Sequence, residues 1–408
     1  MIRVFGRIGL LSFGGPAAQI ALMHRELVET RNWLSEQAYL RALSLCMLLP
    51  GPEAMQLATY AGWRMRGTAG GLLAGLLFVL PGAAVIAVLA FLYAAYGQLP
   101  LVQAAFVGIK AAVIIVVFQA LQRLAPKALE GAQGVTLAVL SFIALFAFAV
   151  PFPLVIIAAG AFGMWHARSL PVPAPQPAQV VAARPVRVIA LWGILWAAPL
   201  LAVWALEADF LLQLGLFFSK LAVVTFGGAY AVLAYMTQTV VSDLGWITTQ
   251  QMIDALGLAE TTPGPLILVT QFVALLAGFA QSGPTGAIAA GLMALWVTFC
   301  PCFLWIFLAG PYLERISAQP RLNGALRAIT AAVVGVIANI GAWFALHVLF
   351  GRVGNWGALA LPLPELASFD ARAGMLTVLA ALLMLGLRTP FVPAMAVLAG
   401  CGLGLALI

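Results

Sequence analysis

Long apolar runs, each bounded by a few polar residues, cover almost the whole chain. Several runs reach about 18 apolar residues, the length at which a helix can cross about 30 Å of hydrocarbon. The pattern predicts two sets of four membrane segments, at 4–23, 38–61, 68–94 and 101–121, and at 214–240, 251–279, 284–312 and 323–349. Each set is followed by a short apolar pair split by a turn, at 151–153 and 388–390. With a separate run at 188–206, the chain is expected to be an all-α polytopic membrane protein of about 13 segments.

The two sets are copies of one unit. A shift of 213 residues places Phe13-Gly14-Gly15 on Phe226-Gly227-Gly228, and Pro50-Gly51-Pro52 on Pro263-Gly264-Pro265. Apolar composition alone produces chance matches of alanine, leucine and valine, but not FGG and PGP at one offset. We therefore expect an internal duplication. The predicted division is an N-terminal repeat at 1–165, a proline-rich cytoplasmic linker at 166–187, a connecting transmembrane helix at 188–209 and a C-terminal repeat at 210–408.

The number of segments before the second copy sets its orientation. Six segments and one connector make an odd count, so the second copy is expected to be inverted relative to the first. Cytoplasmic loops carry an excess of Lys and Arg, and one set of loops holds Arg64, Arg66, Arg123, Lys127, Arg168, Arg184, Arg187, Arg315, Arg321 and Arg388. The loops at 95–100, 150–153 and 280–284 hold none, although 24–41 and 241–250 fit the rule poorly. The charges predict a cytoplasmic N-terminus and a C-terminus on the opposite side of the membrane.

The FGG and PGP sequences interrupt segments that should otherwise be continuous helices. Glycine permits the backbone angles of a break, and proline removes an N–H donor. Irregular backbone at membrane depth persists only where it is buried in protein or lines a wet cavity. A broken helix also offers free N–H groups and partial positive charge, which bind anions. Paired breaks in inverted halves are typical of transporter binding sites, whereas a plain packing kink is the alternative interpretation.

Three cations lie inside the predicted segments, where a charge is costly and usually faces a functional cavity. Lys220 falls on Arg7 at the offset of 213, and Lys110 lies midway along the run 101–121. Snorkelling to the headgroups is the alternative for Arg7. The expected anion site, at half-helix N-termini near the midplane, comprises Arg7, Phe13, Gly14, Gly15, Pro50, Gly51, Pro52, Gln56, Lys110, Lys220, Phe226, Gly227, Gly228, Thr261, Thr262, Pro263, Gly264 and Pro265.

Acidic and neutral polar residues accompany the PGP sequences. Glu53 follows the first, and Glu260 precedes the second by two residues, so either could carry a coupling proton or pair with a cavity cation. Asp254 and Arg41 occupy matching positions and are interpreted as interfacial charges. The neutral hydrogen-bonding residues, which suit an oxyanion or equally a bond between helices, are Gln56, Thr261, Thr262, Thr270 and Gln271.

Composition excludes several other classes of protein. The 408 residues are 64% hydrophobic and only 8% charged, with a mean hydropathy of +1.07, whereas a soluble domain is about a quarter charged. The net charge of +7 does not indicate nucleic-acid binding, because the basic residues lie at the ends of apolar runs. There is no Walker A loop, metal-ligand spacing or nucleophile set, so neither a cofactor nor an enzymatic activity is expected.

The motifs themselves resemble those of the chromate ion transporter family. They are FGGPAAQI at 13–20, LPGPE at 49–53, FGGAYAVL at 226–233 and ETTPGP at 260–265, and the resemblance covers nearly the whole chain in the long, two-domain form of the family. It implies an inner-membrane protein that exports chromate using the proton gradient, with sulfate as a similar anion. Met47 and Ala234 depart from the pattern, where glutamine and proline would be expected.

Three functions compete at this point. The favoured one is a proton-driven secondary carrier that exports chromate, with the lipid bilayer, the oxyanion and protons as its partners. A carrier or channel for sulfate or another small oxyanion is the runner-up, since inverted broken repeats serve both, and a membrane enzyme comes third. A homodimer is left open.

Overall fold

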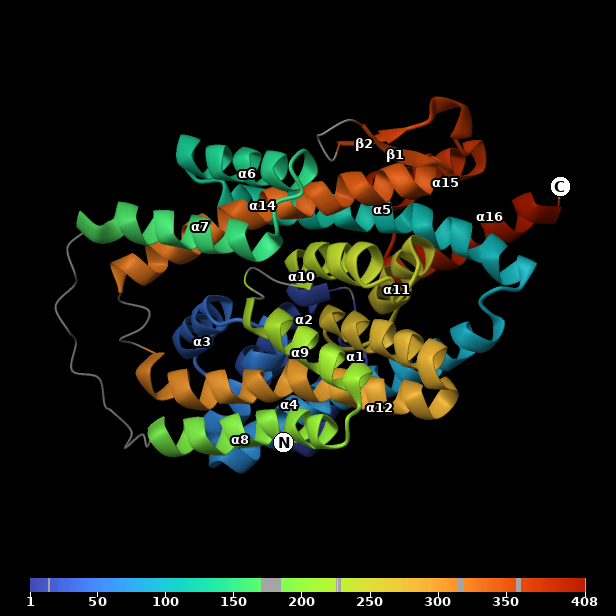
Figure 1. The fold of residues 1–408 in the computed structure, drawn as a ribbon. Coiled ribbons are helices and arrows are strands. Elements are labelled where there is room, and N and C mark those ends of the chain that lie inside the picture. The colour runs from blue at the N-terminus through green and yellow to red at the C-terminus, as the bar shows by residue number, and fades with distance from the viewer. Residues whose placement is uncertain are drawn as a thin grey trace. The chain divides into compact units, whose positions relative to one another are not determined.

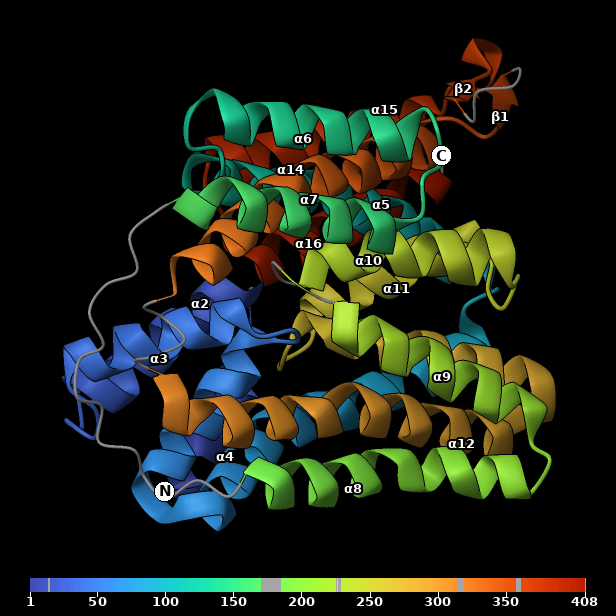
Figure 2. The same cartoon turned by 60° about the vertical axis from the view of Figure 1, so that its left-hand side comes forward.

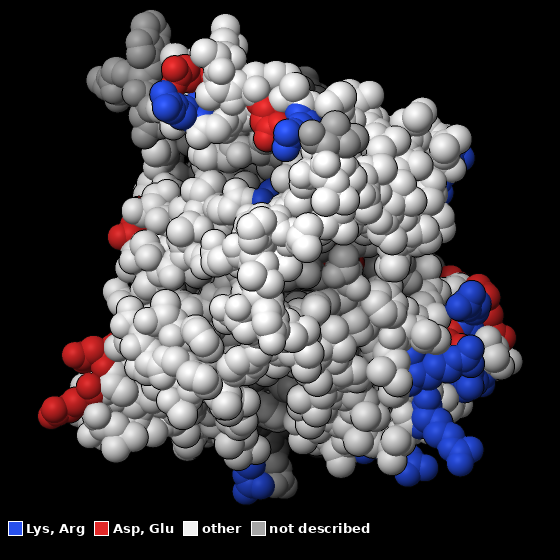
Figure 3. Space-filling view, turned by 90° about the vertical axis from the view of Figure 1, so that its right-hand side faces the viewer, with Lys and Arg blue, Asp and Glu red and all other residues white. Residues whose placement is uncertain are grey.

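The computed structural model describes residues 1–13, 15–169, 185–224, 226, 229–313, 319–356 and 361–407, and these are overwhelmingly helical (Figure 1). Within those ranges, five helices are long and apolar enough to cross a membrane. On the face drawn in Figure 3, charged side chains are few and most surface atoms belong to uncharged residues. The protein is therefore an all-α polytopic membrane protein, as the apolar pattern predicts.

The chain forms two compact units, each built from both halves of the sequence. Unit 1 comprises Met1–Phe91, Met164–Ala229 and Thr262–Leu326, and unit 2 comprises Leu92–Gly163, Tyr230–Thr261 and Arg327–Ile408. The two units therefore do not coincide with the two predicted repeats. The boundaries of the repeats stay a prediction. Most of the predicted linker, at 170–184, lies outside the described residues.

Unit 1 contains the broken segments of the first copy. They are α1 (Ile2–Leu11), α2 (Gly15–His24) with a π-helical turn at Arg25–Glu29, α3 (Glu36–Leu48) and α4 (Glu53–Tyr96), whose last turn belongs to unit 2. The chain between α1 and α2 breaks beside Gly15 (φ 78°), and that between α3 and α4 breaks at Gly51 (φ 115°). Both predicted interruptions are therefore true helix ends, and glycine supplies the left-handed backbone at each.

The second copy contributes the rest of unit 1. It supplies α9 (Asp209–Val224), a 3-10 turn at Leu266–Leu268, α12 (Val269–Ala309) and a further 3-10 turn at Gly310–Tyr312, and the connector supplies α8 (Pro185–Ala205). Figure 2 shows α12 between α8 and α9, and each of the three contacts the other two. Small residues permit the close approach: a Cβ at Gly215 of α9 would meet Leu200 of α8 at 2.5 Å and Met293 of α12 at 3.1 Å.

Both α4 and α12 are helical hairpins rather than straight rods. The backbone leaves the helical region at Arg66 and Gly67 (φ 63°, ψ −158°), and again at Ser282 and Gly283 (φ 64°, ψ −153°). The arms then meet through facing glycines, Gly62 with Gly70 and Gly278 with Gly286. The same device recurs at corresponding positions of the two predicted copies.

Unit 2 holds the remaining elements. Its helices are α5 (Pro100–Ala128), α6 (Gly131–Phe146), α7 (Phe152–His166), α10 (Ala229–Thr237) with a π-helical turn at Gln238–Asp243, α11 (Thr249–Thr261), α14 (Pro320–Leu349), α15 (Ala371–Ala381) with a π-helical turn at Leu382–Gly386, and α16 (Phe391–Leu407). An antiparallel hairpin of β1 (Val353–Trp356) and β2 (Leu361–Pro364) follows α14, with Val353 paired to Pro364. Its apolar and proline-rich sequence gave no strand signal.

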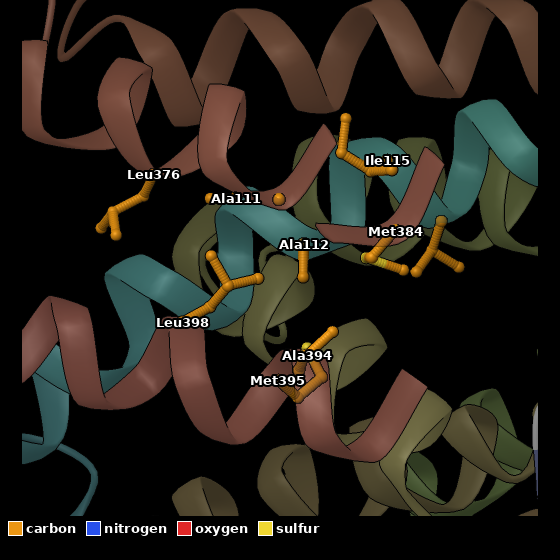
Figure 4. Close-up of a cluster of buried hydrophobic side chains, with 10 residues drawn as sticks. Ala111, Ala112, Ile115, Leu376, Met384, Ala394, Met395 and Leu398 are labelled. Carbon is orange, nitrogen blue, oxygen red and sulfur yellow. The ribbon is translucent and has the colours of Figure 1, made fainter. Parts of the chain in front are cut away.

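The core of unit 2 lies where α5 packs against α15 and α16 (Figure 4). Alanines of α5 contact leucine and methionine side chains of the two later helices, and the buried members are Ala111, Ala112, Ile115, Val116, Leu376, Ala380, Met384, Ala394, Met395 and Leu398. Gly108 faces the backbone of Leu398, and Gly402 faces that of Ala104. Small residues at a crossing let two backbones approach closely, which gains van der Waals contact where lipid offers no hydrophobic driving force.

The crossing of α5 and α16 gives a stability prediction. In Gly108→Ala the new Cβ would collide with the carbonyl oxygen of Leu398, so the crossing must open, at a cost of about 1–3 kcal/mol. Gly400→Ala on α16 is the matched control, because a Cβ there would meet no atom within 4 Å. We expect a lower melting temperature for the purified protein in detergent with Gly108→Ala alone. Equal melting temperatures for the two variants would contradict this packing.

Candidate functional site

The first FGG break bonds directly to the second PGP break, and both belong to unit 1. The Gly264 N–H donates to the Ser12 carbonyl oxygen at 3.0 Å. The Gln19 amide, 1% exposed on α2, donates to that oxygen at 3.2 Å and to the Gly264 carbonyl oxygen at 2.7 Å. Two interruptions more than 200 residues apart in sequence therefore satisfy each other's backbone groups, as a membrane interior requires.

The two PGP breaks pack in equivalent ways. A Cβ at Gly51 would lie 2.8 Å from Sγ of Cys302, and a Cβ at Gly264 would lie 3.4 Å from Cα of Gly82. Gly82 and Cys302 each follow the proline of their hairpin, Pro81 or Pro301, so each PGP meets the corresponding position of the other copy. Both break centres favour glycine because each has a positive φ, and at Gly51 a Cβ would also be too close to Cys302.

Each PGP break is followed by a half-helix, but the two starts differ. At the first, α4 begins with Glu53, and the Gln56 amide donates to the Pro50 carbonyl oxygen at 2.7 Å. At the second, the chain continues into the buried apolar turn at Leu266–Leu268. A carboxylate at a helix N-terminus interacts favourably with the helix dipole, so Glu53 occupies a position that suits an anion.

The neutral donors near the second PGP are engaged by backbone oxygens. Thr261 donates to Leu258 at 2.7 Å, Thr270 to Ile267 at 2.8 Å and Gln271 to Ala83 at 3.2 Å. The Oε1 atoms of Gln19, Gln56 and Gln271 are buried and accept no hydrogen bond within the described residues. These amide oxygens can accept a hydrogen bond from water or from a ligand.

The cations aligned at the N-termini of the two copies lie at exposed positions. Arg7 has a 63% exposed side chain and lies 3.7 Å from the buried carboxylate of Glu26, which also binds Arg31 at 2.5 Å. Lys220 on α9 is exposed as well, and it has its own interaction partner. The structure therefore gives Arg7 a carboxylate partner that the sequence analysis did not identify.

Lys110 lies in unit 2 and is buried. Its Nζ lies 3.3 Å from Oδ1 of Asp254 on α11, and Oδ2 of that aspartate accepts the hydroxyl of Tyr93 at 2.7 Å. Asp254 has no exposed surface, so its interpretation as an interfacial charge is wrong. Sequence reasoning missed this partner because Lys110 and Asp254 are 144 residues apart and belong to different copies.

The second buried acid of α11 is Glu260, at the end of the helix. The Tyr230 hydroxyl donates to Glu260 Oε1 at 2.6 Å, and Arg123 of α5 interacts with the carboxylate electrostatically. A buried carboxylate next to a tyrosine and a cation is a chemically reasonable proton carrier. Its pairing with Tyr230, which lies four residues after Phe226, was not visible in the sequence.

The remaining predicted site residues are placed as follows. Phe13 is exposed and Phe226 is half-buried, and Pro52, Thr262, Pro263 and Pro265 are buried in unit 1. Gly14, Gly227 and Gly228 lie outside the described residues. The structure thus gathers the described break residues of both copies in unit 1, whereas Lys110, Glu260 and Thr261 belong to unit 2.

Known proteins support the motif-based expectation. The chromate transporter family model matches each half of the chain, at residues 1–164 and 212–405. The chain belongs to the chromate transporter family. It is 34% identical to the chromate transport protein of Pseudomonas aeruginosa, over 82% of this chain and 77% of that protein. No solved structure matches the chain.

Two further members of the chromate transporter family show the same extent of similarity. The chain is 32% identical to a probable chromate transport protein of Synechococcus elongatus, over 83% of this chain and 82% of that protein. It is 29% identical to the chromate transport protein of Cupriavidus metallidurans, over 83% of this chain and 80% of that protein. The protein is accordingly a membrane transport protein and not an enzyme.

The Gln19 contacts predict that this side chain holds the two breaks together. Gln19→Leu leaves the Gly264 carbonyl oxygen without its donor and should destabilise unit 1 by about 1–3 kcal/mol. Gln213→Leu, at an exposed position of α9, is the control. Thermal unfolding of both variants in detergent tests this. An unchanged melting temperature for Gln19→Leu would show that the hydrogen bonds of the Gln19 amide are not needed for stability.

His24 gives a prediction of pH dependence outside the membrane segments. Its Nε2 lies 2.7 Å from Glu36 Oε2 and its Nδ1 3.1 Å from Glu29 Oε1. The hydrogen bond to Glu36, with the charges of both carboxylates, raises the pKa of His24 above its ordinary value of 6.5. The protonated histidine therefore stabilises the fold fully below that value, and the contribution is lost as the pH rises through the raised pKa.

Melting temperatures measured across this pH range check the sign. The melting temperature of the wild type should exceed that of His24→Gln at acidic pH, and this difference should shrink as the solution becomes alkaline. Glu36→Gln should shift the loss to lower pH, because it removes the main cause of the raised pKa. A difference that is constant with pH would rule out this ion pair as its source.

Proposed function

We propose that this protein is a secondary carrier that exports chromate across the bacterial inner membrane in exchange for protons. Its family, and relatives that are chromate transport proteins, support the substrate. The observation that carries the proposal is the pairing of helix breaks across the two copies, in which Gly264 and Ser12 satisfy each other. Such crossed breaks create a region that is not continuous helix, where an ion can be bound and released.

The proposed architecture follows from the same duplication. We place two inverted repeats in about 13 membrane segments, with the N-terminus cytoplasmic and the C-terminus periplasmic. The matched hairpin turns at Gly67 and Gly283 support two equivalent copies. The anion is bound at the half-helix N-termini after the breaks, with Arg7, Lys220 and the residues of the FGG and PGP sequences around it. A carrier or channel for sulfate or another small oxyanion is the alternative.

Two carboxylates are proposed as carriers of the coupling proton. Glu260 is buried and bonded to a tyrosine hydroxyl, and Glu53 lies at the start of a half-helix. In each case protonation removes a negative charge next to the region in which an anion must move. Proton entry can thereby be linked to oxyanion exit.

Flux into proteoliposomes tests the proposal. With the vesicle interior acidic, proton exit should drive saturable chromate uptake, and a protonophore that collapses the gradient should abolish the accumulation. Sulfate should compete. Flux that neither saturates nor responds to the pH gradient would indicate a channel, and sulfate flux without chromate flux would favour the alternative substrate.

A further inference from the structure

A cavity of about 730 Å³ in unit 2 reaches the buried Lys110. Its walls come from α5, α14, α15 and α16 and from the segment that joins α14 to α15. Lys110 lies ten residues after Pro100, the first residue of α5, which corresponds to about 15 Å along the helix. That depth is about half of a hydrocarbon core of about 30 Å. The cavity therefore leads from an exposed rim to a cation deep in the membrane segment.

The charges that line this cavity favour an anion. Two cations, Lys110 and Arg372, face one acid, Asp370. Asp370 already caps the N-terminus of α15, where its Oδ1 accepts the N–H groups of Arg372 and Ala373 at 2.9 and 3.1 Å. The Arg372 guanidinium forms no ion pair within the part of the chain that the structure describes. The lining thus has an excess of positive charge.

Neutral donors and a histidine complete the lining. His347 lies at the end of α14 and donates its Nδ1–H to the Trp343 carbonyl oxygen at 2.9 Å, which leaves Nε2 unengaged by that bond. Gln103 and Gln250 also line the cavity. Because a neutral His347 then accepts at Nε2, the amide N–H groups of the two glutamines are the neutral donors that suit an oxyanion beside the cations.

A second hollow lies next to this cavity. It has a volume of about 900 Å³ and shares Gln250, His347, Phe350 and Gly351 with the first. Its outer wall carries the exposed ion pair of Arg352 and Glu365, whose charged atoms lie 3.5 Å apart. The two hollows share these four wall residues, so they are neighbours in unit 2.

Asp254 holds the amine of Lys110 from outside this lining. It is not among the residues that surround the cavity, and only one of its oxygens, Oδ2, accepts a hydrogen bond within the described residues. Oδ1 is fully buried, accepts no hydrogen bond within the described residues and lies 3.3 Å from the Lys110 amine. In a buried ion pair with one unsatisfied oxygen, the free-energy cost of desolvation is not fully offset by hydrogen bonds. An arriving anion of higher charge can therefore compete for the amine.

From these observations we infer that the cavity is an oxyanion-binding site of unit 2 and that Asp254 is its internal competitor for Lys110. Its ligand is a doubly charged tetrahedral oxyanion, and this assignment rests on the proposed transport of such an anion. Lys110 binds the anion at the buried end, Arg372 attracts it at the rim, and Asp254 reclaims the lysine when the site empties. The break residues of unit 1 do not line this cavity.

Binding to the purified full-length protein in lipid nanodiscs tests the inference, with sulfate as a redox-inert probe and calorimetry as the readout. Lys110→Met should weaken sulfate binding by at least about tenfold, because a charged hydrogen bond is lost. Asp254→Asn should tighten it severalfold by removing the competitor. Arg327→Gln is the matched control, since this exposed arginine of unit 2 pairs with Glu130 and does not line the cavity.

The exchanged pair Lys110→Asp with Asp254→Lys separates binding from structure. It restores an ion pair between α5 and α11, so a melting temperature near wild type shows that the variant folds. We expect it to bind sulfate as poorly as Lys110→Met. Sulfate affinity restored by the exchange, unchanged by Lys110→Met or absent from wild type would overturn the inference.

Chromate flux in proteoliposomes distinguishes this inference from the proposed function. If wild type moves no chromate while sulfate binding still depends on Lys110, the site stands and the transport proposal fails. If wild type and Lys110→Met transport chromate with the same half-saturation and bind sulfate equally well, the transport proposal stands and the site is overturned.

Discussion

The membrane interior supplies no water to satisfy polar groups, and this constraint governs every irregular feature of the protein. Where the helices break, the freed backbone atoms bond across the two copies, as Gly264 does with Ser12. Where charges enter the membrane segments they find partners, as Lys110 does in Asp254. The polar groups that remain unsatisfied, including amide oxygens of Gln19, Gln56 and Gln271, are therefore informative. These three glutamines lie in the segments that carry the breaks.

Glycine serves two distinct purposes in this fold. At Gly51, Gly67, Gly264 and Gly283 it adopts positive φ and ends or reverses a helix. At Gly108 and Gly402 it is helical and lets two backbones meet, because lipid-embedded helices gain little from burying apolar side chains. The first use defines where the transport region is irregular, and the second holds the surrounding helices in a fixed arrangement. An alanine-rich core such as that of α5 belongs to the second use.

Each of the two compact units draws on both halves of the sequence, and therefore on both predicted copies. Segments of the first copy end against segments of the second, and the contacts of Gly51 with Cys302 and of Gly264 with Gly82 are counterparts. The buried carboxylates of α11 have no acidic counterpart on α3, where Arg41 and Met47 occupy the positions of Asp254 and Glu260. The copies have therefore diverged in charge while retaining their breaks.

The sequence by itself determined the membrane class and the helix breaks at Gly15, Gly51 and Gly264, because apolar length and Gly/Pro placement are local properties. The internal duplication stays a prediction. The sequence also indicated that Lys110 is unusual, because a cation within a run of apolar residues can be recognised without a structure. Only the tertiary structure decided which break meets which, that Asp254 is buried beside Lys110, and that a cavity reaches this pair. The helical hairpins of α4 and α12 and the pairing of β1 with β2 could likewise not be predicted from the sequence. These are contacts between residues far apart along the chain, and no periodicity in a single segment encodes its distant partner.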